Sequence, residues 1–251
     1  MQHRTEADQQ RVFTILSIAI SAALGGFLFG YDTAVINGAV SSIEATFQIS
    51  ASVLGFTVSS ALLGSAAGAI GAGWLADRIG RRPSMLLAAV LFLLSSVGSA
   101  LAPNLMDLVV WRVLGGVAVG FASVLAPAYI AEISPASMRG RTGSLQQLAI
   151  VLGIFLSLLF NYLIVLATPD QDPMSQLGSM AAWRWMLMAE VVPALLYGFL
   201  VLRIPESPRY LVRTGDLDQA RAVISRTIGE PPETVIDRIQ TSQGEGGGGS
   251  I

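Results

Sequence analysis

The sequence predicts an all-α protein that crosses a membrane six times, because its residues are mostly apolar, carry little charge and fall into long apolar runs. Of 251 residues, 53% are hydrophobic and only 13% are charged. A run of about 18 apolar residues can cross a hydrocarbon core of roughly 30 Å as a helix. The predicted spans cover residues 12–43, 51–76, 83–106, 108–131, 142–169 and 185–202.

These runs differ in where charge interrupts them. The second, third and fifth carry no charge, whereas the first is interrupted only by Asp32, the fourth only by Arg112 and the sixth only by Glu190. The first run is too long for the core of a signal peptide, and no small-residue cleavage site follows a short apolar segment. We therefore expect it to be retained as a transmembrane helix.

The distribution of arginine predicts the orientation of the chain. All 15 basic residues are Arg, and nearly all lie before the first span, between spans two and three, between spans four and five, or after span six. Basic residues near helix ends stay on the cytoplasmic side. The pattern predicts a multi-pass protein of the cell inner (plasma) membrane with both termini in the cytoplasm.

Composition divides the chain into four parts. We expect a cytoplasmic N-terminal tail (1–11), a six-helix transmembrane domain (12–204), cytoplasmic amphipathic helices (205–241) and a Gly-rich flexible tail (242–251). Asp216 can cap the first amphipathic helix. The absence of Cys excludes disulfides and thiolate metal sites, and the single His, His3, lies in the polar tail. We expect neither a metal nor a cofactor.

A glycine pattern recurs in spans one and four. Leu24-Gly25-Gly26 is followed by Gly30 and Tyr31, and Leu114-Gly115-Gly116 is followed at the same spacing by Gly120 and Phe121. A repeat of three helices reverses direction across the membrane, so the pattern predicts two inverted copies of the kind found in secondary transporters. The alternative is chance similarity between glycine-rich helix contacts.

The three buried charges lie at similar predicted depths. Counted at about 1.5 Å per residue, Asp32, Arg112 and Glu190 share one level of the membrane. Ionisable groups at such depth pair with one another and often mark ion pathways. A carboxylate that can exchange its Arg partner for a proton would be a coupling device, whereas the alternative is a permanent salt bridge that only holds two helices together.

Several motifs resemble those of a known family. Residues 73–82 read GWLADRIGRR, similar to the signature loop of the major facilitator superfamily, and residues 205–209 read PESPR, similar to a signature of its sugar porter branch. Further likeness lies in GYDTAVING (30–38), WRVLGG (111–116), PAYIAEISPASMRGR (127–141) and the run Gln146-Gln147-Leu148. The resemblance covers residues 12–228 and is strongest to bacterial proton-coupled glucose and xylose permeases.

This resemblance implies one six-helix half of a major facilitator fold, with a 3+3 inverted repeat, and assigns roles by position. Asp32, Arg112 and Glu190 match proton-coupling residues. Gln147 matches a residue that hydrogen-bonds sugar hydroxyls, and Phe29 and Ile150 match cavity-lining residues, although ordinary packing explains these two equally well. A cytoplasmic gate is implied at Gly73, Asp77, Arg78, Gly80, Arg81, Arg82, Glu132, Arg139, Arg141, Glu206 and Arg209.

Sugar porters have two such halves, whereas these residues match only the first. Three explanations for the match to one half remain open: a half-sized transporter that works as a homodimer, one half of a split transporter, or a truncated fragment. We favour truncation. The expected partners are a monosaccharide, protons, the lipid bilayer and a second six-helix half, with no nucleic acid. The alternatives to proton symport are a passive sugar facilitator and a non-transporting sensor. An enzyme is disfavoured, because no second carboxylate forms a catalytic pair with Asp32.

Overall fold

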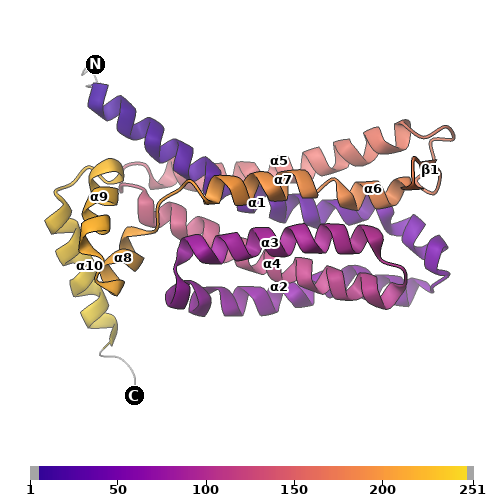
Figure 1. Ribbon diagram of the computed structural model, residues 1–251, viewed down its shortest axis with the longest axis horizontal. Coiled ribbons are helices and arrows are strands. Elements are labelled where there is room, and N and C mark those ends of the chain that lie inside the picture. The colour runs from indigo at the N-terminus through magenta and orange to yellow at the C-terminus, as the bar shows by residue number, and fades with distance from the viewer. Residues whose placement is uncertain (1–5, 248–251) are drawn as a thin grey trace.

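The computed structural model describes residues 6–247 and shows the predicted bundle (Figure 1). Six segments are long and apolar enough to cross a membrane, which confirms the predicted number. The first five crossings are single helices: α1 (Glu6–Phe47), α2 (Ala51–Ile79), α3 (Arg81–Leu101), α4 (Leu105–Ile133) and α5 (Arg139–Leu166). A short hairpin of β1 (Gln176–Leu177) and β2 (Met180–Ala181) then leads into the sixth crossing.

The sixth crossing is broken into two helices, whereas the sequence predicted one continuous span. Helix α6 (Ala182–Met188) ends just before Glu190, and α7 (Val191–Val201) begins just after it. Pro193 explains the break, because it has no N–H to donate to the carbonyl of Ala189. That carbonyl instead accepts from Val192 at 3.3 Å, one residue earlier than in an α-helix.

Both ends of the described chain are more helical than the sequence suggested. Helix α1 begins at Glu6, inside the predicted tail, and α10 continues to Gly247, inside the predicted flexible segment. A hydrogen bond of 3.4 Å from Gln243 to the carbonyl of Arg209 ties the end of α10 to α8 and helps to hold these last turns. His3 and the residues after Gly247 lie outside the described part.

The three helices after the bundle form a small separate layer. Helices α8 (Pro208–Thr214), α9 (Leu217–Thr227) and α10 (Pro232–Gly247) lie beyond one end of the bundle, the end near which α1 begins (Figure 1). The predicted cap is present, since the Asp216 side chain accepts from the backbone N–H of Gln219 at 3.2 Å. The predicted apolar faces meet in a core built around Leu211, Ile224 and Val235.

Close glycine contacts join the two halves of the repeat. A Cβ at Gly30 would lie 2.1 Å from the carbonyl oxygen of Ile150, and one at Gly120 would lie 2.2 Å from that of Ser65. Such distances leave no room for a side chain. The backbones of α1 and α5 are therefore in close contact, and those of α4 and α2 are in close contact in the same way. The second pair of contacts follows the same rule: Gly153 meets the carbonyl of Phe27, and Gly68 meets that of Val117.

These contacts relate the two repeats position by position. Phe27 precedes Gly30 by three residues, as Val117 precedes Gly120, and the partners on α5 and α2 are spaced in the same way. Helix α2 packs mainly on α4, and α5 packs mainly on α1. The second helix of each repeat therefore packs on the first helix of the other repeat. The recurrence read from the sequence is therefore a structural inverted repeat, and chance similarity does not explain it.

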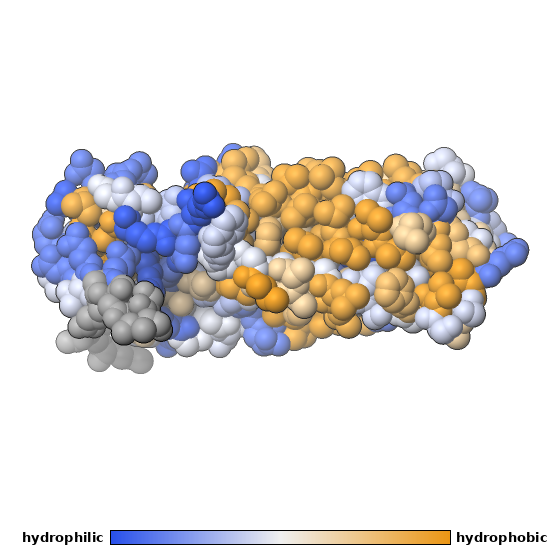
Figure 2. All heavy atoms as spheres, turned by 90° about the horizontal axis from the view of Figure 1, so that it is seen from below, coloured by the Kyte–Doolittle hydropathy of each residue, from blue (hydrophilic) through white to orange (hydrophobic). Residues whose placement is uncertain are grey.

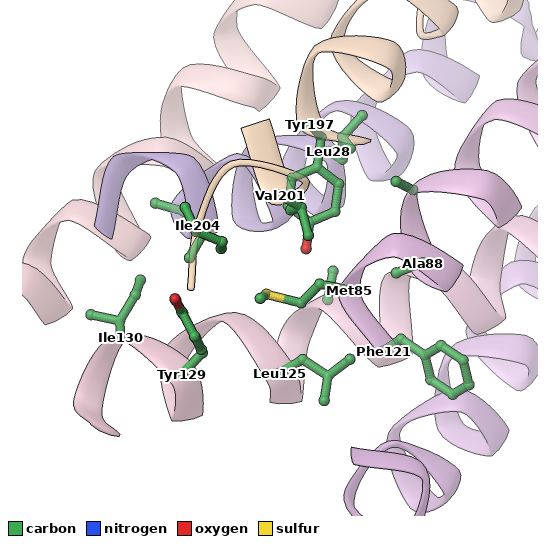
Figure 3. Packing of buried hydrophobic residues seen from close by; sticks show 14 of the residues in the cluster. Leu28, Met85, Ala88, Phe121, Leu125, Tyr129, Ile130, Tyr197, Val201 and Ile204 are labelled. Carbon is green, nitrogen blue, oxygen red and sulfur yellow. The ribbon is translucent and has the colours of Figure 1, made fainter. Parts of the chain in front are cut away.

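The main hydrophobic core lies where α1, α3, α4 and α7 meet (Figure 3). Met85 and Leu125 are buried between the helices, and Tyr129 and Tyr197 are completely inaccessible. The Tyr129 hydroxyl donates to the carbonyl of Pro205 at 2.7 Å, which fixes the chain leaving α7. This core holds the helices that carry the buried charges.

The face of the bundle shown in Figure 2 is apolar along its middle and hydrophilic at both ends. Helix α5 is the least covered of the six crossings. In its apolar 18-residue stretch 17% is buried, against 56% in that of α4. Its exposed side includes Phe155 and Tyr162. Helices α2 and α5 thus present a broad apolar surface, whereas α1 and α4 are enclosed.

Candidate functional site: a buried charge triad and an ion-pair cluster

Asp32 and Arg112 form an ion pair inside the bundle. Arg112 Nη1 donates to Asp32 Oδ1 at 2.8 Å, and the two side chains are 4% and 3% exposed. Helix α1 supplies the carboxylate and α4 supplies the guanidinium. Arg112 Nε is also buried and has no hydrogen-bond partner within the described residues. The guanidinium therefore keeps a free donor inside the protein.

Glu190 is the third buried charge and lies at the break between α6 and α7. It is 2% exposed, and its Oε1 has no hydrogen-bond partner among residues 6–247. It is close enough to interact electrostatically with both Asp32 and Arg112. The structure thus brings the Glu190 carboxyl within electrostatic range of the Asp32–Arg112 ion pair, as the predicted common depth of the three residues implied.

Gly115 allows α3 to pack closely on α4 beside the ion pair. A Cβ at this position would lie 2.4 Å from Ser95 Oγ and 3.6 Å from Asp32 Oδ1. Ser95 is itself fixed, because its hydroxyl donates to the carbonyl of Trp111 at 2.8 Å. Gly115, three residues after Arg112, therefore lets α3 pack closely on α4 beside the Asp32 carboxylate.

The three proposed sugar-contacting residues lie on α1 and α5. Gln147 is exposed on α5, so both ends of its amide are accessible to a ligand. Phe29 and Ile150 are partly covered, and Phe29 packs against the main core. The neighbouring Gln146 points inward instead: it is 8% exposed, and its amide lies against Gly26. Only one of the two glutamines is therefore available at the surface.

A second polar cluster lies at the α8–α10 end of the bundle. Arg81 binds Glu132 through two hydrogen bonds of 3.2 Å and pairs with Asp77 at 3.0 Å. Asp77 also pairs with Arg213 at 2.9 Å, and the Ser207 hydroxyl donates to Glu132. The cluster joins α2, α3, α4 and the chain around α8.

Glu206 caps the start of α3. Its carboxylate accepts from the backbone N–H groups of Arg81 and Arg82 at 3.0 and 3.1 Å, and from that of Ser207 at 2.7 Å. A carboxylate at a helix N-terminus satisfies free N–H groups and complements the helix dipole. Gly80 permits this contact, because its φ is +102° and a Cβ would lie 2.5 Å from Glu206 Oε2.

The remaining residues of the predicted gate are not joined to this cluster by their side chains. Arg139 and Arg209 line a pocket of about 480 Å³ beside α10 that Glu132 also lines, but neither Arg forms a side-chain ion pair within the described chain. Arg78 lies over the ring of Trp74, 5.1 Å from its centroid. Arg141 is exposed, and Gly73 faces open space.

Two cluster residues were missed from the sequence. Ser207 follows Glu206 directly within PESPR, and Arg213 lies one helical turn after Arg209. The position of Ser207 was a usable signal, because its hydroxyl caps α8 and can reach a second acceptor. Arg213 gave no such signal, since its contact with Asp77 depends on how α8 docks.

The fold defines a class of protein, a polytopic membrane protein built as one half of a major facilitator fold. The family model described as "Sugar (and other) transporter" matches residues 18–246. The chain belongs to this family, which comprises transporters rather than enzymes.

Curated relatives agree with this assignment. The chain is 55% identical to a "Glucose transport protein" of Synechocystis sp. over 91% of this chain and 49% of that protein. It is 39% identical to the "D-xylose-proton symporter" of Escherichia coli over 92% of this chain and 52% of that protein. The chain therefore spans about half the length of the curated relatives it matches.

Solved structures give the same picture. A proton:xylose symporter bound to 6-bromo-6-deoxy-D-glucose superimposes with a TM-score of 0.87 at 37% identity, covering 94% of this chain and 54% of that chain. A partially occluded inward-open form of the Escherichia coli xylose transporter superimposes with a TM-score of 0.86 at 38% identity, covering 93% of this chain and 60% of that chain. The fold is that of one half of such a transporter.

Proposed function

We propose that this chain supplies the N-terminal half of a monosaccharide–proton symporter of the glucose and xylose type, working by alternating access. The observation that carries the proposal is the buried Asp32–Arg112 ion pair with Glu190 beside it. Relatives named for glucose transport and for xylose–proton symport support this substrate class.

The ion pair can couple proton binding to a change in helix packing. A proton on Asp32 would neutralise the carboxylate and weaken its hydrogen bond to Arg112. Arg112 would then have the nearby Glu190 carboxyl as its remaining acidic neighbour. Because Asp32 and Arg112 lie on different helices, the protonated and ionised states favour different arrangements of α1 and α4.

The sugar would bind on the exposed side of α5, next to α1. Gln147 offers both a donor and an acceptor, which suits paired sugar hydroxyls, and its exposure in the structure supports this role. Phe29 and Ile150 would provide apolar contact to the sugar ring. A second six-helix half, packed on the apolar surface of α2 and α5, would form the opposing wall of the pathway.

The cluster around Arg81 would act as the cytoplasmic gate. Its ion pairs with Glu132 and Asp77 link α2, α3 and α4, so opening this end of the pathway would require them to loosen. We place this end, with both chain termini, in the cytoplasm and the protein in the plasma membrane. The distribution of Arg supports that orientation.

The test is uptake of radiolabelled glucose and xylose into proteoliposomes, with and without an inward proton gradient. The chain is assayed alone and as a chimera with the C-terminal half of the Escherichia coli D-xylose-proton symporter. We expect gradient-driven accumulation that Asp32→Asn abolishes while sugar exchange persists. The exposed Glu44→Gln is the matched control and should accumulate normally.

Three results would count against the proposal. Accumulation that survives in Asp32→Asn would remove Asp32 from coupling. Absence of flux from both folded preparations would show that the chain is not a transporting half, and flux indifferent to the gradient would indicate a passive facilitator.

A further inference from the structure

A basic pocket lies at the α8–α10 end of the bundle, apart from the ion-pair cluster. It has a volume of about 470 Å³ and lies between α1, the chain that leaves α7, and α9. Three arginines line it, Arg82, Arg203 and Arg226, and no carboxylate of the described chain does. The pocket beside α10 differs, because Glu132 and Glu230 accompany its arginines.

The guanidinium groups of this pocket keep unused hydrogen-bond donors. Arg82 Nη2 donates to the carbonyl of Leu202 at 2.6 Å, but its Nε is buried without a partner within residues 6–247. Arg203 lies over the ring of Phe199, 4.1 Å from its centroid, and Arg226 has no side-chain hydrogen bond or ion pair in the described chain. An anion is the ligand that such a set of donors accommodates.

An apolar groove begins where the basic pocket ends. This groove, about 310 Å³, runs between α3 and α7 and is lined by residues such as Leu93, Leu195 and Phe199. Leu202 lines both the groove and the basic pocket, so the two adjoin each other. Phe199 also joins them, because it lines the groove and carries the Arg203 guanidinium on its ring.

We propose that this composite site binds an anionic phospholipid, with its phosphate among Arg82, Arg203 and Arg226 and one acyl chain in the α3–α7 groove. A positive pocket at the end of a membrane-crossing bundle matches the depth of lipid phosphates, and the apolar groove leads from it toward the membrane centre. A free phosphate would share the headgroup chemistry but would leave the groove empty. The inference goes beyond transport, because it concerns a face of α3 and α7 away from the charge triad.

The test is native mass spectrometry of the full chain purified in detergent and titrated with phosphatidylglycerol or with phosphatidylethanolamine of the same acyl chains. We expect preferential retention of phosphatidylglycerol. Each arginine removed should weaken binding about fivefold, so Arg203→Gln/Arg226→Gln should weaken it about 25-fold. Arg238→Gln, which removes an exposed charge outside this pocket, is the matched control and should leave binding unchanged.

A second variant tests the groove without touching the charges. A Cβ at Gly198 would lie 3.5 Å from Ala89 Cβ, an ordinary contact, so Gly198→Leu should fold and fill the groove. We expect it to weaken phosphatidylglycerol binding but not the binding of glycerol phosphate, whereas Gly55→Leu, in open space on α2, should change neither. Circular dichroism confirms that each variant is helical.

The outcomes separate the possible ligands. Equal retention of phosphatidylglycerol by the double Arg variant would overturn the proposal. Binding of inorganic phosphate or glycerol phosphate as tight as that of the phospholipid, unaffected by Gly198→Leu, would show a site for a soluble phosphate and would equally overturn it.

Discussion

Arg112 donates to Asp32 across 2.8 Å, and this bond joins α1 to α4, the first helices of the two inverted repeats. The pair is nearly inaccessible to solvent. It therefore connects the two repeats through a buried ion pair.

Arg112→Gln is expected to destabilise the bundle strongly, because it leaves Asp32 buried without its partner. Breaking one side of a buried pair costs about 3–5 kcal/mol in the free energy of unfolding. The double variant Asp32→Asn/Arg112→Gln should recover most of this loss, since neither residue is then charged. Unfolding in mixed micelles measures both, and a double variant no more stable than the single one would show that the pair is not the cause.

Gly30→Ala is expected to weaken the packing of α1 on α5. The new Cβ would meet the Ile150 carbonyl oxygen at 2.1 Å, so the helices must separate. A loss of about 1–3 kcal/mol in unfolding free energy follows from such overpacking. Gly55→Ala is the control, because its Cβ meets nothing within 4 Å. If both variants unfolded alike, the close contact would have no energetic role.

Glu206→Gln is expected to loosen the start of α3. The amide offers only one acceptor oxygen, whereas the carboxylate oxygens bind the backbone N–H groups of both Arg81 and Arg82. Loss of such a cap costs about 1 kcal/mol. Hydrogen exchange at the amides of Arg81 and Arg82 should be about fivefold faster. Glu233→Gln, which removes an exposed partner of Arg221, should leave these amides unchanged.

Gln147→Ala is expected to lower sugar affinity without lowering stability, because the side chain is exposed on α5. One lost hydrogen bond of about 1 kcal/mol corresponds to an affinity roughly fivefold lower. Leu148→Ala, a truncation of the exposed neighbour, serves as the control. Equilibrium binding of labelled glucose in the transporting vesicles measures the difference, and equal affinities would remove Gln147 from the sugar site.

Much of this architecture could be predicted because the membrane restricts what a chain can do. Long apolar runs predict the six crossings. Because charge is so scarce within these runs, Asp32, Arg112 and Glu190 stand out in the sequence, and their similar depths predict that they interact. The glycine recurrence gave the inverted repeat, because glycine marks close helix contacts.

The missing details depend on packing rather than on composition. Pro193 does not by itself predict the break at Glu190, because proline is tolerated in many membrane helices. Gln146 is buried and Gln147 exposed because of the way α5 is rotated about its own axis, which the sequence does not specify. Arg213 reaches Asp77 only through the docking of α8, a short helix whose position no local pattern determines.

The exchange of partners between the repeats also sets an order for biogenesis. Helices α1 and α2 are synthesised before α5 and α4, the helices on which they mainly pack. The glycine-rich faces of α1 and α2 therefore stay unpacked, at the translocon or in lipid, until α5 and α4 have been synthesised. We expect the nascent chain to become resistant to protease only after α5 has been inserted, and not helix by helix as each one emerges.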